Sequence, residues 1–421
     1  MKIRLKSTYL VLIALASACS VGSVSYDNDY TYLYDQKESL IKPEFKIFHH
    51  SADSSRLYFQ VNSSDVLYSK IDGDTLTKSL MMVKYKLRSF DNKNTLIDSA
   101  TYPLIDYGLN KADAIIQSQL NFKCASGNQY YIEIRLRDQF KDLNVVHFLI
   151  VDKRENGNEQ YYLVKSGEKV LPNQIAVNSN KIVIEKSPLL KEDHFLIQYE
   201  SKSYKKAFPP FAMSRLNEKI LEADATDSIR FSDNKLQLTL DANVTRLIPV
   251  NSDDETANSL YVRYYYDGFP EITQLEQMLE PIRFISTTNE YNNIIESSEK
   301  RKAFEAFWLQ LAKNQNSAKA LIREYYGRIE TANRFFSSFK PGWKTDRGII
   351  FIVYGDPYRV EKTFNNEIWY YGEDNNILSV KFQFNKIQTD WSSNDFELLR
   401  DQNYKNNWYR AVDVWRQGRI N

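Results

Sequence analysis

Residues 130–137 read Tyr-Tyr-Ile-Glu-Ile-Arg-Leu-Arg, and apolar and charged side chains alternate along this stretch. The two sets are the apolar Ile132, Ile134 and Leu136 and the charged Glu133, Arg135 and Arg137. Successive side chains of a strand point to opposite faces, so the stretch is typical of a half-buried antiparallel strand. The same period recurs at 45–47, 57–61 and 82–87, with turn-forming clusters at 91–94 and 125–128. The region 43–152 therefore predicts a β-sandwich of about six to eight short strands.

Residues 153–272 repeat this pattern more loosely. Candidate strands lie at 161–164, 181–185, 194–199, 228–231, 236–240 and 260–266. A longer connection between them holds Pro209, Pro210 and an acidic stretch at 222–227, residues that interrupt strands. We expect a second antiparallel β-sandwich-like domain in this region.

The character of the sequence changes after residue 272. Thr287 and Glu290 have the spacing of a capping box, in which a side-chain oxygen and a carboxylate each bind an orphan N–H of a helix. Apolar residues then recur at helical spacing over 304–311, and again over 318–336 after the polar break 314–316. Two helices joined by a short polar link predict an antiparallel helical hairpin.

Strand patterns return at 348–354, 367–371 and 377–384, which predicts a three-stranded antiparallel meander after the hairpin. The C-terminal region is therefore expected to be an α+β domain. Taken together, the patterns predict a multidomain, mainly β fold. Two N-terminal antiparallel β-sandwich-like domains would be followed by the α+β domain, which combines a helical hairpin with a three-stranded antiparallel meander.

The first residues have the order of a bacterial export signal. A basic start at 2–6 precedes an apolar run at 9–15 and small residues before Cys19. The run is shorter than the ~20 apolar residues that cross a bilayer. This arrangement resembles a bacterial lipoprotein signal, which implies that Cys19 is lipidated and that Ser20 after it directs the protein to the outer membrane. The alternative is an ordinary signal with an incidental cysteine.

These patterns divide the chain into five expected segments. They are a signal peptide at 1–18, the lipidated Cys19 and a tether at 19–40, a β-sandwich at 41–152, a second β domain at 153–272 and the α+β domain at 273–421. The polar tether is expected to join the lipid to the folded domains. Which face of the membrane carries those domains stays open.

Composition bounds the function. Lys plus Arg number 55 and Asp plus Glu number 54, so the formal net charge is +1. This balance argues against a protein whose main affinity comes from neutralising phosphates of nucleic acid or of an anionic membrane. The chain has two cysteines, which excludes a disulfide-stapled scaffold and a cysteine-rich zinc module. Cys124 alternates with Leu120 and Phe122, so we expect it to be a buried thiol.

Sequence motifs of catalysis are absent. The chain has no glycine-rich phosphate loop, no nucleophile elbow and no His-Glu-x-x-His helix. His49 and His50 are adjacent, so in a strand their rings point to opposite faces, and the acidic residues 253–255 lack the oxygen spacing of a calcium loop. We predict no catalytic residue, no metal and no cofactor. A hydrolase stays open as an alternative, because paired carboxylates meet in space and leave no spacing in the sequence.

One C-terminal motif resembles a known family. Residues 342–348 read Gly-Trp-Lys-Thr-Asp-Arg-Gly, and Tyr-Gly-Asp-Pro at 354–357 and Glu-Ile-Trp-Tyr-Tyr at 367–371 follow it. This order resembles the GWxTD domain, which occurs in Gram-negative envelope proteins that are often lipoproteins. The resemblance covers roughly 275–421 and implies an envelope location without implying an activity.

The motif residues have a structural and a functional interpretation. Gly342 permits close approach of the backbone, Thr345 or Asp346 can accept backbone N–H groups at a turn, and Arg347 can pair with a carboxylate. The alternative is direct partner binding. Residues 408–416 fit an amphipathic helix, whose aromatic face is either packed on the domain or an interface anchor. The candidate partner-binding residues are Trp343, Thr345, Asp346, Arg347, Trp408 and Trp415.

These features favour a non-catalytic outer-membrane lipoprotein, held in the membrane by the lipid on Cys19. It would act as an accessory or scaffold subunit that binds other outer-membrane or periplasmic proteins, for example in outer-membrane assembly or secretion. Nucleic acid is not an expected partner. The alternative is a surface lipoprotein that binds glycans, since sandwiches with exposed Tyr and Trp can stack sugars, and a hydrolase is the third hypothesis.

Overall fold

The computed structural model describes most of the chain after residue 40. The described residues are 41, 43–70, 76–92, 95–108, 114–141, 143–154, 158–176, 179–200, 204–213, 223–241, 244–250, 259–363, 365–373, 379–387, 392 and 394–419. The expected signal peptide, Cys19, the tether and the acidic residues 253–255 lie outside them.

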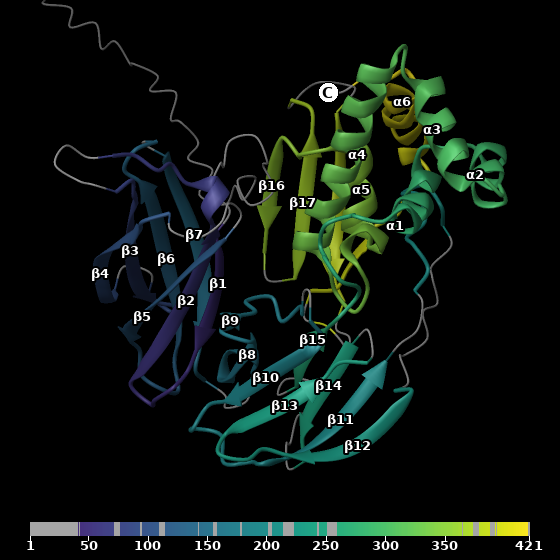
Figure 1. Cartoon of the computed structure of the whole chain (residues 1–421). Coiled ribbons are helices and arrows are strands. Elements are labelled where there is room, and N and C mark those ends of the chain that lie inside the picture. Colours follow the sequence, from purple (N-terminus) through teal and green to yellow (C-terminus); the bar gives the residue numbers. More distant parts are fainter. Residues whose placement is uncertain are drawn as a thin grey trace, which may run out of the picture.

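The N-terminal region is a sandwich of two antiparallel sheets (Figure 1). One sheet has the order β1 (Glu44–Phe48), β2 (Ser54–Asn62), β5 (Ile115–Lys123), and the other has the order β4 (Leu96–Asp106), β3 (Ser79–Ser89), β6 (Gln129–Asp138), β7 (Leu143–Asp152). Alternate residues of both sheets, such as Leu57, Val83 and Ile134, are fully buried in one core. This confirms the strand pattern expected from the sequence.

The second β region also has two antiparallel sheets. The first has the order β13 (Lys235–Thr239), β10 (Lys181–Lys186), β8 (Tyr162–Ser166), β9 (Lys169–Val170), and the second has the order β12 (Ala225–Arg230), β11 (His194–Glu200), β14 (Val244–Pro249), β15 (Leu260–Arg263). Phe195, Leu236 and Val262 meet in its core. A smaller cluster of Phe48, Tyr58, Leu163 and Val170 joins it to the N-terminal sandwich.

A buried polar cluster stiffens the N-terminal sandwich. The Lys153 ammonium group donates hydrogen bonds to the backbone oxygens of Ser51, Ala52, Ser54 and Cys124 at 2.7–3.2 Å. Cys124 is 1% exposed, and burial raises the pKa of its thiol. The thiol is therefore a packed core group, as the alternation around it predicts.

The helical region begins with α1 (Leu275–Leu279) and α2 (Thr288–Ile295). Thr287 and Glu290 form the expected capping box at the start of α2. The long helices α3 (Lys300–Leu311) and α4 (Gln315–Phe336) then form the expected hairpin, and their apolar stripes bury Trp308, Tyr325 and Phe336.

The structure corrects the expected strand at 348–354, which is the helix α5 (Asp346–Tyr354). The Thr345 hydroxyl accepts the Gly348 N–H at 3.0 Å and caps this helix. All residues from 347 to 353 are buried, because α5 lies between α4 and a sheet and its Phe351 ring contacts both Phe336 and Trp369. A short run that is apolar on every side carries no periodicity, so its pattern cannot separate a helix from a strand.

The C-terminal sheet has four antiparallel strands where the sequence predicts three. Their order is β16 (Arg359–Lys362), β17 (Asn366–Tyr371), β18 (Val380–Lys386), β19 (Phe396–Leu398). The helices α4 and α5 cover one face of this sheet, and α6 (Tyr404–Arg416) packs beside α5 (Figure 1). The mainly β fold with a C-terminal α+β part is therefore confirmed, and only the identity of the strands in the last part differs.

Candidate functional site

The first glycine of the GWxTD motif brings two backbones into contact. Gly342 opens a short turn of 3-10 helix, Gly342–Lys344, that lies against α4. A Cβ atom on Gly342 would lie 1.8 Å from the Ala332 carbonyl oxygen, so only glycine fits there. The Trp343 N–H donates to the Asn333 side-chain oxygen at 3.2 Å, which fixes the turn on α4.

The threonine of the motif closes the turn and starts α5. Its hydroxyl donates to the Gly342 carbonyl at 2.7 Å and accepts the Gly348 N–H at 3.0 Å. A Cβ atom on Gly348 would lie 1.9 Å from the Gly342 carbonyl oxygen, so the second glycine is also required by close packing. Thr345 is therefore an N-cap residue, which matches the structural interpretation of the motif.

The aspartate of the motif links α5 to the last strand. Both oxygens of Asp346 accept hydrogen bonds from the Arg400 guanidinium group, and Oδ2 also accepts the Leu398 N–H at 2.8 Å. Asp346 stands in the first turn of α5, where a carboxylate is favoured by the helix dipole. This residue holds β19 and the segment after it against the motif.

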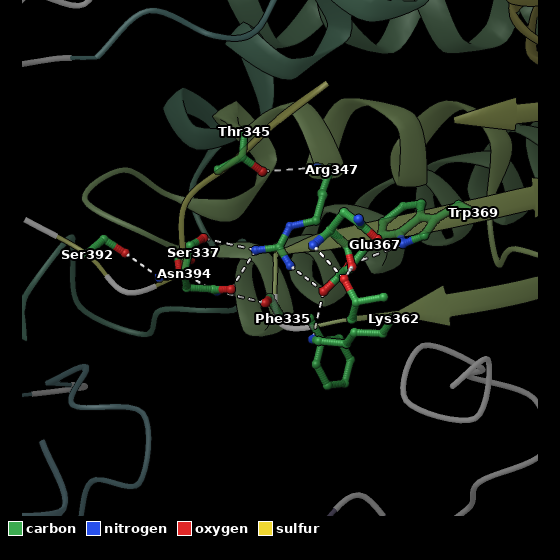
Figure 2. A network of polar contacts seen from close by, with 12 residues as sticks. Phe335, Ser337, Thr345, Arg347, Lys362, Glu367, Trp369, Ser392 and Asn394 are labelled. Carbon is green, nitrogen blue, oxygen red and sulfur yellow. Dashed lines mark hydrogen bonds and ion pairs between the residues drawn. The ribbon is translucent and has the colours of Figure 1, made fainter. Parts of the chain in front are cut away.

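Arg347 forms the centre of a buried polar network, drawn in Figure 2. Its guanidinium group lies 3.1 Å from Glu367 of β17, and the two side chains are 2% and 0% exposed. It also donates to the backbone and side-chain oxygens of Asn394 at 3.0 and 2.6 Å. The rings of Phe396 and Phe336 lie 4.1 and 5.2 Å from the guanidinium carbon. The arginine is thus surrounded by partners from three separate stretches of the chain, at 336, 367 and 394–396.

The partners of Arg347 are themselves held in place. Glu367 accepts a hydrogen bond from Trp369 at 3.3 Å and lies 2.7 Å from the Lys362 ammonium group. The Asn394 amide group donates to the backbone oxygens of Phe335 and Ser337 at 3.2 and 2.9 Å (Figure 2). Burial by itself raises the pKa of Glu367, but the Arg347 and Lys362 charges outweigh it and lower the pKa to about 2. The carboxylate is therefore ionised and paired within the domain.

The candidate tryptophans are core residues. Trp343, Trp408 and Trp415 are 6%, 4% and 3% exposed. The Trp415 indole donates to the Val353 carbonyl at 3.0 Å and packs against the Tyr325 ring and the Arg328 guanidinium group. This corrects the alternative in which the aromatic face of α6 is an exposed anchor, because that face packs back onto α4 and α5.

Truncating these rings should destabilise the domain rather than remove a binding surface. We expect Trp343→Ala and Trp415→Ala each to lower the free energy of unfolding by ~3–5 kcal/mol, because each leaves a large cavity. Tyr409→Ala, on the half-exposed face of α6, is the matched control and should change it by less than about 1 kcal/mol. Denaturant unfolding measures all three. If Trp415→Ala unfolded at the same denaturant midpoint as the wild type, Trp415 could not be a core residue.

A segment from the second β domain, residues 204–213, crosses to the motif and is called the strap below. The Ala207 N–H donates to the Lys344 carbonyl at 2.9 Å, and the Lys344 ammonium group donates to the Tyr204 carbonyl at 3.1 Å. Ala207 belongs to the same core cluster as Trp343. From the sequence we predicted only a long connection that contains Pro209 and Pro210. Its contact with the motif could not be predicted, because the two segments lie far apart along the chain.

Between the strap, the 280–288 segment and α6 lies an open groove of about 940 Å³. Its lining combines aromatic and aliphatic side chains with charged ones; the main members are Lys205, Lys206, Phe208, Phe211, Glu280, Arg283, Phe284, Trp408, Tyr409, Val412, Asp413 and Arg416. Tyr409 and Phe208 are 50% and 36% exposed, and the Tyr409 ring lies 5.5 Å from the Phe211 ring. The groove is therefore a place where large apolar side chains face solvent.

The lining of the groove carries four cations, Lys205, Lys206, Arg283 and Arg416, against two carboxylates, Glu280 and Asp413, so its net charge favours an anionic ligand group. Glu280 lies 3.8 Å from Lys206 and 3.1 Å from Lys344, and Arg283 and Lys206 both lie over the Tyr291 ring. Two lysines therefore share one carboxylate. Arg416 is paired with Glu290, and this hydrogen bond is the main cause that lowers the pKa of Glu290 to about 2.

The described ranges contain no group of three or more His, Cys, Asp or Glu side chains that could hold a metal ion. The His49 ring is buried and bonded to Ser55 and to the Asp152 carbonyl, and burial is the main cause that lowers its pKa to about 3. Among the helices of the described part, none is long and apolar enough to cross a membrane.

Comparisons with solved structures give only distant likenesses. A calcium-binding mutant of Bacteroides uniformis β-glucuronidase 2 and a Bacteroides uniformis β-glucuronidase each match at a TM-score of 0.18 and 10% identity, covering 39% of this chain and 16% of theirs. An Escherichia coli α-2-macroglobulin activated by porcine elastase matches at a TM-score of 0.14 and 12% identity, covering 53% of this chain and 23% of its own. The chain thus spans less than a quarter of these proteins, and such scores assign neither a fold nor an activity.

Comparisons of sequence are more specific. No curated protein matches the chain. No family model matches its N-terminal region. The model of the GWxTD domain matches residues 247–417, which begin inside β14, upstream of residue 273 where the sequence pattern first changes. The match includes the turn, the cap, the Asp346–Arg400 pair and the Arg347 network described above. The C-terminal portion of this chain is therefore a GWxTD domain.

Proposed function

We propose that this chain is a non-catalytic lipoprotein of the outer membrane that serves as an accessory or scaffold subunit for other envelope proteins. The lipid on Cys19 anchors it, and the two β-sandwiches and the GWxTD domain carry binding surfaces. The family match supports the envelope location, because the motif resembles that of Gram-negative envelope lipoproteins. The composition of the leader supports the anchor.

The groove between the strap and α6 is the observation that carries this proposal. The motif side chains are not available to a partner, because Trp343, Thr345 and Arg347 are buried and are bonded within the domain. The groove lies directly beside them and exposes Phe208 and Tyr409. Exposed aromatic residues next to cations are typical anchors of protein interfaces.

The groove suits an extended peptide segment of a partner that carries apolar side chains and carboxylates. Apolar side chains of the segment would pack on Phe211, Tyr409 and Val412. Its carboxylates would face Lys205 and Lys206. The strap is hydrogen-bonded to Lys344 of the motif, so this wall of the groove is ordered before a partner binds, which lowers the entropic cost of binding.

Co-purification with a matched pair of variants tests this proposal. A C-terminally tagged chain is recovered from gently solubilised membranes as wild type, as Tyr409→Ser in the groove, and as Tyr358→Ser, whose tyrosine is 62% exposed and lies outside the groove. We expect an envelope protein in stoichiometric amount with wild type and Tyr358→Ser, and about tenfold less with Tyr409→Ser. Mass spectrometry quantifies the recovery.

Two results would contradict the proposal. Recovery of the tagged chain alone, repeated after cross-linking, would remove the accessory-subunit role. Equal recovery with both tyrosine variants would remove the groove as the binding site. A glycan that binds wild type but not Tyr409→Ser on an array would instead support the glycan-binding alternative, because aromatic rings also stack sugars.

A further inference from the structure

The sheet β4-β3-β6-β7 has one face in the sandwich core and one face turned outward. Met81, Val83, Tyr85 and Leu87 of β3 point into the core. Because side chains alternate along a strand, the intervening residues of β3 and β6 point away from it. On β3 and β6 the charged residues of that outer face are Lys84, Lys86, Arg88, Glu133, Arg135 and Arg137, and β7 adds Asp152, which is paired with Arg154.

Strand register brings these charges together. Lys84 lies opposite Arg135, and Lys86 lies opposite Glu133. Neighbouring strands are ~4.8 Å apart, and successive side chains on one face of a strand are ~7 Å apart. The two central strands therefore carry five cations and one carboxylate, and that carboxylate is paired with Arg135. The whole chain has a net charge of +1, so positive charge is concentrated on this face.

The two edge strands surround these cations with exposed apolar side chains. Leu96 and Ile105 of β4 are 51% and 43% exposed, and Phe148 and Ile150 of β7 are 49% and 37% exposed. Leu96 lies opposite Arg88, and Phe148 lies opposite Glu133, so they belong to the same outer face. We call this surface, with its cationic centre and its apolar rim, the basic face.

We propose that the basic face binds the surface of a lipid bilayer that contains anionic phospholipids. The cations would lie over the lipid phosphates, and Leu96, Ile105, Phe148 and Ile150 would insert among the headgroups. A soluble polyanion would bind the cations but would make no use of the apolar rim. The presence of both cations and an apolar rim therefore favours a bilayer. This inference does not depend on the proposed accessory role or on its partner.

The shape of the surface supports the same occupant. The sheet places these residues on one broad face rather than in a cleft.

Vesicle co-sedimentation tests the proposal. The protein used is the unlipidated chain beginning at Ser20, which retains every described residue, so that no acyl chain contributes. The probes are vesicles of phosphatidylethanolamine with phosphatidylglycerol, and vesicles of phosphatidylcholine alone. We expect binding to the anionic vesicles only, weakening as salt rises from about 0.05 M to about 0.5 M because exposed charges are screened.

Matched variants separate the basic face from total charge. Lys84→Gln/Lys86→Gln/Arg135→Gln should lower the partition coefficient on anionic vesicles about 100-fold. Lys169→Gln/Lys181→Gln/Lys235→Gln removes the same charge from exposed positions of the second β domain and should lower it less than about threefold. Thermal unfolding of both variants checks that the fold is retained. We expect it to be retained, because all these residues lie outside the cores.

The apolar rim has its own test. Phe148→Ser/Ile150→Ser should lower vesicle binding about tenfold, and the loss should persist at high salt, while binding to soluble dextran sulfate should be unchanged. Equal vesicle binding by the two triple-glutamine variants would overturn the proposal. Binding of wild type to dextran sulfate without binding to anionic vesicles would overturn it as well, and would assign the face to a soluble polyanion.

Discussion

Gly348→Ala is expected to destabilise the GWxTD domain by at least about 3 kcal/mol. The new Cβ atom would lie 1.9 Å from the Gly342 carbonyl oxygen and 3.0 Å from the Trp343 Cα atom, both of which are backbone atoms. Backbone cannot move aside as a flexible side chain can, so the turn would have to separate from α5. The hydroxyl of Thr345, which joins the two segments, would then lose its geometry.

Gly327→Ala is the matched control for this prediction. Gly327 also lies inside a helix, α4, but no atom is within 4 Å of a Cβ atom built there. We expect it to be neutral or to stabilise by up to about 1 kcal/mol, because alanine is the better helix former. Denaturant unfolding followed by tryptophan fluorescence reports the C-terminal region, since five of the six Trp come after residue 340. Equal midpoints for the two variants would contradict the close-packing account.

Glu367→Gln is expected to destabilise the domain by ~3–5 kcal/mol at neutral pH, because it leaves the buried Arg347 charge without its counter-ion. The amide retains the shape of the carboxylate, so the loss of stability measures the removal of the charge and not a change in side-chain volume. Glu299→Gln is the control, because Glu299 and Lys302 form a pair whose side chains are 62% and 74% exposed. Breaking that exposed pair should cost less than about 1 kcal/mol.

The stabilisation by Glu367 should decrease as the pH falls. The pKa of Glu367 in the folded protein is about 2, below its ordinary value of 4.5. Its contribution to stability is therefore fully present above about pH 5 and is lost as the pH falls from 4.5 through about 2. The difference in unfolding free energy between wild type and Glu367→Gln should shrink by about 3 kcal/mol across this range. A difference that is constant with pH would show that the carboxylate is not held ionised by Arg347.

Much of the fold could be predicted from periodicity. Strands with one buried face, such as β3 and β6, alternate visibly, and the stripes of α3 and α4 recur at helical spacing. The helix α5 could not be assigned in this way, because it is buried on all sides and no face of it is polar. The strands β16 and β19 have four and three residues, which is too short to show a pattern.

The motif could be interpreted residue by residue, but its partners could not be predicted. Cap, turn and ion-pair roles follow from the chemistry of Thr345, Gly342 and Arg347. The partners Glu367, Asn394 and the strap come from distant segments, and the Lys344 contact with Tyr204 spans 140 residues. Such pairings arise from packing and leave no local signal in one sequence.

The basic face likewise could not be predicted from the net charge of the chain. The balance of 55 basic and 54 acidic residues suggested that phosphates are not a main source of affinity. Charge averaged over a chain does not show where the folded protein places it. The positions 84, 86 and 88 and the positions 135 and 137 alternate with core residues, so the sheet places all of their charges on one face.

The most direct test of the binding proposal is photo-crosslinking in intact cells, with benzoylphenylalanine placed at Tyr409 or, as control, at Tyr358. The first position lies in the groove, and the second is an exposed tyrosine outside it. We predict one discrete crosslinked envelope protein from Tyr409 and none from Tyr358. The absence of a crosslinked product at Tyr409, or the same products from both positions, would contradict the claim that the GWxTD domain serves as a scaffold with its partner in this groove.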